Sequence, residues 1–165
     1  MNRTAALACL FASLVLVATA SGETLKVGPD GKFKSPSAAI KAARPGDVIE
    51  IASGDYIDDS VKVRTDKLTI RGVGKTRPRL IWKTGLIPNK KAIFAQSGSD
   101  LVVENLEFIG ARVRSGNGAG IRAQGRNLTV RHCRFFDNQD TILGGMGNSM
   151  GAVAGVLVAV YYNTL

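Results

Sequence analysis

The sequence predicts an all-β protein folded as a parallel β-helix, a solenoid of short strands, with a short N-terminal capping helix. Three observations support this fold class: an apolar pattern that repeats along the chain, short strand-like segments with no helical segments between them, and a high glycine content. Glycine accounts for 19 of the 165 residues and aromatic residues for 6%, which favours many turns and a thin core over a long helical bundle. The length suits one compact domain or one piece of an elongated one.

Residues 1–20 have the features of a signal peptide that is removed from the mature protein. Arg3 supplies a positive charge, residues 5–17 form an apolar stretch, and residues 18–20 are Ala-Thr-Ala, which fits a cleavage site. The apolar stretch is short for a bilayer span, so we favour cleavage over an uncleaved anchor. We therefore expect a secreted or periplasmic protein with no membrane partner after cleavage.

An amphipathic segment that starts near residue 35 predicts the capping helix. Ser35 suits an N-cap and Pro36 the first helical position, and the next residues place apolar side chains on one side. Residues 44–47, Arg-Pro-Gly-Asp, end the helix. Such a helix would cover the unpaired backbone groups at the first coil of a solenoid. Later segments are typical of strands and turns, beginning with residues 48–51 and 61–63.

An apolar pattern recurs three times with the same internal spacing. Apolar residues stand at offsets 0, 2, 5 and 7 from Leu101 and again from Leu128, and at offsets 0, 2 and 5 from Leu68. This spacing indicates a strand, a bend and a second strand, because two pairs of alternating apolar residues are separated by a shift of three positions. The starting residues are 33 and 27 positions apart, a period typical of stacked units that bury their core only between neighbours.

These units predict a β-helix domain over residues 21–145 with about three to five incomplete coils, to which residues 92–94, 120–122 and 141–143 contribute further strands. A β-sandwich is the alternative, and it would explain the strands but not the repeated offsets. Residues 146–165 form an atypical apolar tail, either one buried strand or the end of a truncated or frameshifted chain. With so few coils the C-terminal end of the solenoid would lack a cap, so we also expect self-association through that end.

Basic residues are concentrated in two parts of the chain. Residues 71–91 contain seven basic residues and no acid, and residues 108–136 contain six arginines and no acid, within a net charge of +9. A surface of this kind attracts a polyanion. Export favours an acidic polysaccharide, and we expect no nucleic acid partner, since the aromatic residues that stack on bases are scarce among these arginines. A solvated basic face without a partner is the alternative.

Three segments in the second half of the chain carry a resemblance to a known family. They are Gly120-Ile121-Arg122, Cys133-Arg134-Phe135 and Gln139-Asp140-Thr141-Ile142, with Gly54-Asp55-Tyr56 upstream. Together they resemble the pectinesterase branch of the right-handed β-helix proteins, which have the pectin-lyase-like fold. The resemblance covers roughly residues 24–145. It implies a right-handed coil, a carbohydrate esterase activity and a truncated member of the group.

The resemblance also implies roles for individual residues. Asp140 would be the general acid, Gln139 would hold the oxyanion, and Asn117 stands where the family has a second oxyanion glutamine. The family's nucleophilic aspartate would fall near residues 160–162, which are Val-Tyr-Tyr here, and no acid follows Asp140. Because an aspartate-nucleophile mechanism needs two carboxyl groups, we expect weak activity or none from this chain.

The predicted substrate-binding residues are Arg122 and Arg126, on the basic surface, and Tyr56, whose ring could face a sugar although packing is the alternative for it and for Trp82. We expect no cofactor and no metal site, since His132 is the single histidine and Cys133 is the only cysteine after the signal peptide. Cys133 suits a core position and His132 a bend between strands. A non-catalytic structural or adhesion β-helix is the alternative function. Salt-sensitive binding of polygalacturonate that is lost when Arg122 and Arg126 are reversed would discriminate between the two functions.

Overall fold

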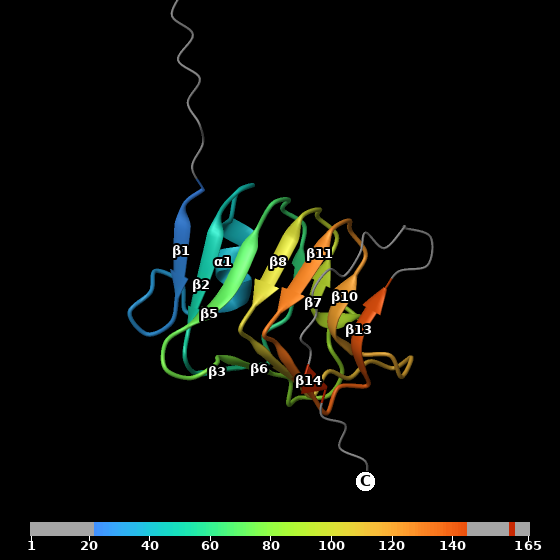
Figure 1. The fold of residues 1–165 in the computed structure, drawn as a ribbon. Helices are drawn as coiled ribbons and strands as arrows, with labels where there is room; N and C mark the ends of the chain where they lie inside the picture. Colours follow the sequence, from blue (N-terminus) through green and yellow to red (C-terminus); the bar gives the residue numbers. More distant parts are fainter. Residues whose placement is uncertain (1–21, 145–158, 161–165) are drawn as a thin grey trace, which may run out of the picture.

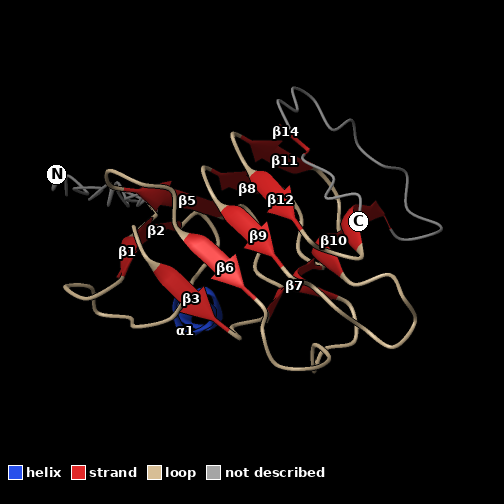
Figure 2. Cartoon of the chain, turned by 90° about the horizontal axis from the view of Figure 1, so that it is seen from below, coloured by secondary structure: helices blue, strands red, loops and turns tan. Residues whose placement is uncertain are grey.

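A computed structural model describes residues 22–144 and 159–160, so the signal peptide predicted for residues 1–20 lies outside the described residues. The strands form three parallel sheets, named A, B and C here, which the chain visits in turn (Figure 1 and Figure 2). Sheet A consists, in spatial order, of β1 (Thr24–Val27), β2 (Val48–Ala52), β5 (Thr69–Val73), β8 (Leu101–Glu104) and β11 (Leu128–Arg131). Sheet B consists of β3 (Asp55–Ile57), β6 (Arg79–Ile81), β9 (Glu107–Ile109), β12 (Arg134–Phe136) and β14 (Ala159–Val160). Sheet C consists of β4 (Val61–Val63), β7 (Ala92–Gln96), β10 (Ala119–Ala123) and β13 (Asp140–Gly144).

The described strands from β2 to β13 therefore make four successive coils, each with one strand in every sheet. All the pairings are parallel, as the stacking of coils requires. The predicted all-β parallel β-helix is confirmed. The β-sandwich alternative is excluded, because sandwiches are built from antiparallel sheets.

The predicted capping helix is α1 (Pro36–Ala42). The Ser35 hydroxyl accepts a hydrogen bond from the Ala38 amide at 3.3 Å, and Pro36 occupies the first helical turn as expected. The helix ends where Ala43 returns to an extended conformation, with φ −68° and ψ 146°. Ala39 and Ile40 are buried, and the helix lies against β1, β2 and β4. It thus covers the first coil.

The core consists of columns of apolar side chains, each side chain lying on the equivalent residue of the neighbouring coil. Leu101 pairs directly with Leu128, as the repeated offsets predict. The columns and their members, all buried, are Ile49, Ile70, Val103 and Val130 in sheet A; Leu80, Phe108 and Phe135 in sheet B; and Val61, Phe94 and Ile121 in sheet C. Each coil therefore buries its apolar residues against the coils beside it, as in other solenoids.

The repeat that starts at Leu68 departs from the prediction at its third position. Val73 ends β5 beside Ala52 and is only half-buried, so it is not the counterpart of Leu106. Leu80 instead lies in register with Phe108. The turn between β5 and β6, residues 74–78, is longer than the equivalent turn of the two later coils, which shifts the second apolar pair along the sequence.

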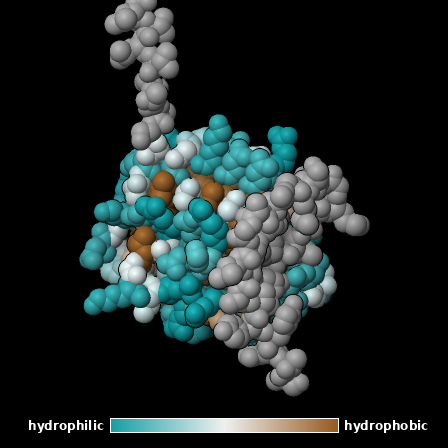
Figure 3. Space-filling model, viewed as in Figure 1, coloured by the Kyte–Doolittle hydropathy of each residue, from teal (hydrophilic) through white to brown (hydrophobic). Residues whose placement is uncertain are grey.

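Columns of alternating charge run across the outer faces of sheets A and B. On sheet A, paired positions carry Lys26, Glu50, Arg71, Glu104 and Arg131. On sheet B they carry Asp55, Arg79, Glu107 and Arg134. Figure 3 shows the sheet A side, with small apolar areas between hydrophilic side chains. Opposite charges on directly paired residues stabilise a sheet, so both columns favour the observed register.

Most of the predicted apolar tail, residues 146–165, lies outside the described residues, but Ala159–Val160 forms β14. This strand pairs with β12 and places Val160 beside Phe135, so it extends sheet B. Within the described parts of the chain no helix is both long and apolar enough to cross a membrane.

Candidate functional site

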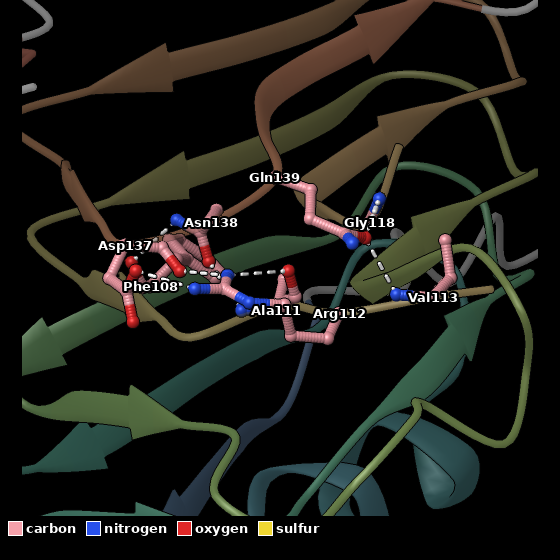
Figure 4. Close-up of polar contacts among 8 residues, drawn as sticks. All are labelled: Phe108, Ala111, Arg112, Val113, Gly118, Asp137, Asn138 and Gln139. Carbon is pink, nitrogen blue, oxygen red and sulfur yellow. Dashed lines mark hydrogen bonds and ion pairs between the residues drawn. The ribbon is translucent and has the colours of Figure 1, made fainter. Parts of the chain in front are cut away.

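The predicted catalytic residues lie at the corner where the chain enters sheet C. Three segments of successive coils stack there: residues 82–91, 110–118 and 137–139. The Ile87 amide donates to the Arg112 carbonyl at 2.9 Å, which joins the first segment to the second. Figure 4 shows how side chains of the third segment hold the second.

Asp137 and Asn138 fix the start of the 110–118 segment. The Arg112 guanidinium pairs with the Asp137 carboxylate at 2.5 Å and also donates to the Asp137 carbonyl. The side-chain oxygen of Asn138 accepts from the Ala111 amide at 2.8 Å, and its Nδ2 donates to the Phe108 carbonyl at 2.9 Å (Figure 4). The backbone before Asn117 is therefore held by side chains from the next coil.

Gln139 fixes the far end of the same segment. Its Oε1 accepts from the amides of Val113, at 2.7 Å, and Gly118, at 2.9 Å (Figure 4). Because these two bonds anchor the amide oxygen, the NH₂ group of Gln139 points away from the Val113 and Gly118 amides. The side-chain oxygen of Asn117 is likewise engaged, since it lies 2.5 Å from the Ser115 hydroxyl, which is the donor of that pair.

Asp140 begins β13 beside these two amides. Its backbone amide donates to the Gly118 carbonyl at 2.9 Å, and the residue pairs with Ala119 of β10. The structure thus brings Asn117, Gln139 and Asp140 to one corner through their shared neighbour Gly118. This arrangement offers two side-chain NH₂ donors and one carboxyl group.

The three predicted substrate-binding residues do not gather at this corner. Arg122 lies on β10, in the same strand as Ala119, and its Nε is buried with no partner among the described residues. Arg126 is exposed in the turn beyond the other end of β10. Tyr56 lies on sheet B of the first coil, in register with Leu80, and its hydroxyl donates to the Ala52 carbonyl at 3.0 Å.

Tyr56 is half-buried. Its ring packs against the core, and burial raises the pKa of its hydroxyl above the ordinary value. Trp82 is also buried, with 8% of its surface exposed, and its indole nitrogen donates to the Gly85 carbonyl at 3.1 Å. Packing, the alternative for both residues, accounts for these contacts.

The basic residues do not form one uniform basic surface as the sequence suggests. Six of the thirteen in the two acid-free stretches have an acidic partner: Arg71, Arg77, Arg79, Arg112, Arg131 and Arg134. Their partners lie mainly on sheets A and B. Among the described residues, the basic side chains on and near sheet C take part in no salt bridge; these include Lys62, Lys91, Arg114, Arg122 and Arg126.

The strands of sheet C carry little negative charge of their own. Lys62 and Arg122 stand on either side of Ala95 in one outward column, and Asp140 is the only acid in the four described strands. A hollow of about 680 Å³ adjoins Lys62, between α1, β4 and the 82–89 segment. Of the basic residues in the described strands, Lys62 and Arg122 of sheet C and Lys26 of sheet A therefore take part in no salt bridge.

Two acids in this hollow have structural contacts. The Asp59 carboxylate accepts from the Ser37 amide in the first turn of α1 at 2.8 Å. Asp58 accepts from the Lys83 and Thr84 amides at 2.6 and 3.1 Å, and the Lys83 bond is the main cause of the lowered pKa of the Asp58 carboxyl. Both acids in the hollow are therefore hydrogen-bonded to backbone amides.

Cys133 and His132 lie where the sequence predicts. Cys133 is buried in the core, and burial raises the pKa of its thiol to about 11, which makes it a poor nucleophile. His132 occupies the bend between β11 and β12 with φ 53°, equivalent to Asn105 of the preceding coil. The described residues contain no group of acidic, cysteine and histidine side chains that could hold a metal ion.

No family model and no curated protein sequence matches the chain. The comparison with solved structures finds pectin methylesterases. A pectin methylesterase mutant in complex with a hexasaccharide superimposes with a TM-score of 0.53 at 18% identity, over 76% of this chain and 50% of that chain. The chain has the fold of the pectin methylesterases, a right-handed parallel β-helix.

Two further pectin methylesterases match more loosely. The enzymes from Aspergillus niger and Erwinia chrysanthemi give TM-scores of 0.48 and 0.46, each at 17% identity over 72% of this chain and 50% of theirs. The chain spans about half the length of the solved structures that it matches. These likenesses describe the fold, whereas the activity depends on the site.

Proposed function

We propose that the protein is exported and binds an acidic polysaccharide across the outer face of sheet C. The observation that carries the proposal is the uneven distribution of charge. Arginines on sheets A and B are paired with acids, whereas Lys62 and Arg122 project from sheet C without acidic partners among the described residues. A polyanion is attracted to the face where positive charge is not neutralised.

The geometry of this face suits an extended chain. Lys62 and Arg122 are two coils apart, about 10 Å at the usual spacing of parallel strands. The hollow beside Lys62 continues the face toward α1, and its volume of about 680 Å³ is in the range of sugar-sized sites. Its cations are Lys41, Lys62 and Arg64, and its two acids, Asp58 and Asp59, accept hydrogen bonds from backbone amides. One of the solved structures with this fold is a complex with a hexasaccharide, which supports a polysaccharide as the partner.

Binding of polygalacturonate tests this proposal. Replacing Lys62 and Arg122 together by glutamine should weaken binding about tenfold at low salt, a loss of about 1.4 kcal/mol. Replacing Lys26 and Lys75 by glutamine removes the same total charge elsewhere and should have little effect. Affinity of the unmodified protein should fall as NaCl is raised. Equal losses in the two double variants would refute a specific face.

For catalysis, we propose that the corner at Asp140 contains part of the catalytic residue set of a pectinesterase-type carbohydrate esterase. Asp140 would give its proton to the departing alcohol, and the NH₂ groups of Gln139 and Asn117 would donate to the oxyanion. The sequence contains no acid after Asp140 to serve as the nucleophile. We therefore expect little or no methanol release from methylated pectin. Release that Asp140→Asn abolishes would overturn this expectation.

The pairing of six basic residues with acids favours one other function, that of a non-catalytic structural or adhesion β-helix whose charges stabilise the coil. In that case the unpaired cations would be solvated and have no partner. Failure to bind polygalacturonate even at low salt would support this alternative, whereas salt-sensitive binding without methanol release would support a binding protein.

A further inference from the structure

A second hollow, of about 670 Å³, lies between the 82–91 and 110–118 segments. It adjoins the catalytic corner, because its lining residues Val113 and Ser115 contact Gln139 and Asn117, and it shares only Pro88 with the hollow beside α1. Its described lining residues are Leu86, Ile87, Pro88, Lys90, Val113, Arg114 and Ser115. No acidic residue is among them. The proposed glycan face does not account for this hollow, since its walls are largely apolar.

The apolar part of the hollow is built by two stacked turns. Ile87 and Val113 are each 2% exposed and belong to the core, whereas Leu86 is 51% exposed and is the most exposed large apolar side chain in the described region. The Ile87 amide donates to the Arg112 carbonyl, which holds one segment on the other. The exposed apolar surface of the hollow is therefore that of Leu86 and Pro88, and the buried Ile87 and Val113 hold it in place from below.

Positive charge lies on the same two turns. The Lys90 amide donates to the Ile87 carbonyl at 2.9 Å, and the Gly116 amide to the Val113 carbonyl at 3.1 Å. These bonds close tight turns that carry Lys90 on one segment and Arg114 and Ser115 on the other. Neither Lys90 nor Arg114 has a salt-bridge partner among the described residues.

We propose that this hollow binds an amphiphilic monoanion, a small molecule with an apolar body and one carboxylate. The apolar body would lie against Leu86 and Pro88, above the buried Ile87 and Val113, and the carboxylate would pair with Lys90 and Arg114. The volume is that of pockets for small organic ligands. A free sugar acid lacks the apolar body, and a neutral lipid lacks the charge, so the lining selects against both. The inference is independent of the proposed glycan binding.

The sequence supplies a reporter for this site. Trp82 is the only tryptophan in the chain, and its indole nitrogen donates to the carbonyl of Gly85, the residue before Leu86. A ligand that contacts Leu86 should change the fluorescence of Trp82. Equilibrium dialysis with radiolabelled ligand measures binding directly, and it therefore detects binding that leaves the fluorescence of Trp82 unchanged.

The test uses decanoate below its micellar concentration and 2-naphthoate, which separate a fatty acid from an aryl carboxylate. We expect saturable binding of at least one, and no saturable binding of acetate, galacturonate or decyltrimethylammonium. The Lys90→Gln/Arg114→Gln variant should bind at least about tenfold more weakly, and Leu86→Ser several-fold more weakly. Lys75→Gln, an exposed lysine outside the hollow, should bind as the unmodified protein does.

Three results would overturn the proposal. They are absence of saturable binding of both carboxylates, binding of decyltrimethylammonium with similar affinity, or unchanged affinity in the Lys90→Gln/Arg114→Gln variant. The polygalacturonate measurement separates this proposal from the glycan proposal. Leu86→Ser should leave polygalacturonate binding unchanged, whereas Lys62→Gln should leave decanoate binding unchanged.

Discussion

The rings of Phe108 and Phe135 stack in the core with their centroids 5.2 Å apart and their planes at 10°. Phe94 meets Phe108 edge-on at the same centroid distance, so the three rings join sheets B and C across the middle of the coil. Because each ring touches the coils above or below it, this cluster links several coils at once. Its contribution to stability should exceed that of any single apolar residue on the surface.

Phe108→Ala should lower the free energy of unfolding by about 3–5 kcal/mol, since it removes a fully buried ring and leaves a cavity. Urea denaturation followed by circular dichroism measures the loss. Ile57→Ala is the control, because Ile57 is 43% exposed, and it should cost less than about 1 kcal/mol. Similar losses in the two variants would contradict the packing described here.

Gly120→Ala should also destabilise the protein, because a methyl group at this position would lie 2.5 Å from Cδ1 of Phe135 and 2.9 Å from Cβ of Phe108. We expect a loss of about 1–3 kcal/mol from overpacking. In a double-mutant cycle, Phe135→Leu should reduce the cost of Gly120→Ala. Strict additivity of the two losses would show that the ring does not limit the space at Gly120.

Glu104→Lys should destabilise the protein because Glu104 pairs with both Arg71 and Arg131 in the outer column of sheet A. Three like charges would then be adjacent, and we expect a loss of about 1–2 kcal/mol at low salt. The loss should shrink in 1 M NaCl, where screening is strong. Lys75→Glu, in an exposed turn, should change stability by less than about 0.5 kcal/mol. A salt-independent loss would indicate that packing rather than charge is responsible.

Gln139→Leu should loosen the 110–118 segment, because it leaves the amides of Val113 and Gly118 without their acceptor. We expect a cost of about 1–3 kcal/mol and faster hydrogen exchange at these two amides. Gln139→Glu keeps an acceptor and should retain most of the protection. The Trp82 amide, which donates to the Ile109 carbonyl, serves as the internal reference. Unchanged exchange at Val113 and Gly118 in the leucine variant would contradict the observed contacts.

Stability should fall at alkaline pH partly because of Cys133. Burial raises the pKa of its thiol from 9.0 to about 11, so the unfolded chain releases this proton at a pH where the folded protein retains it. The folded state therefore loses stability as the pH rises from about 9 to about 11, and this effect is absent below pH 9. Denaturation in urea with a reducing agent at pH 8 and pH 10.5 should show a smaller decrease for Cys133→Ala, by about 1–2 kcal/mol. Parallel decreases would show that other groups account for the alkaline loss.

The architecture could be predicted from the sequence because coil stacking imposes a fixed spacing on apolar residues. The offsets from Leu101 and Leu128 are matched in the structure at all four positions, and both residues lie in the same column. The repeated spacing predicts the wrong inward residue at Val73, because the core does not constrain the length of the turn between two strands. Residues 74–78 lengthen that turn and move the inward position to Leu80.

The distribution of charge was not predicted, although the signal for it is present in the sequence. The position three residues after the first apolar residue of each repeat is charged, and it is occupied by Arg71, Glu104 and Arg131. The position one residue after that apolar residue is uncharged, and it is occupied by Thr69, Val102 and Thr129. Counting basic residues along the chain hides this relation, because the acids that neutralise them come from other coils. The basic surface on sheets A and B is therefore smaller than the run of basic residues in the sequence predicts.

The catalytic roles assigned to the site residues stay predictions, whereas their positions can be compared with the structure. Asn117, Gln139 and Asp140 do meet at one corner, but the supporting roles of Arg112, Asp137 and Asn138 were not foreseen. A run of four polar residues, 137–140, directly before a strand was the available signal. Such a run indicates a turn in which side chains bond to backbone, yet it does not indicate which neighbouring coil supplies the backbone.

The alternating column of sheet A limits how such a molecule can lengthen by internal duplication. Repeating one coil would set two residues of the same sign beside each other, whereas repeating two adjacent coils would restore the alternation throughout. Growth of this solenoid in pairs of coils would therefore preserve a favourable outer surface, and growth by a single coil would require a compensating substitution.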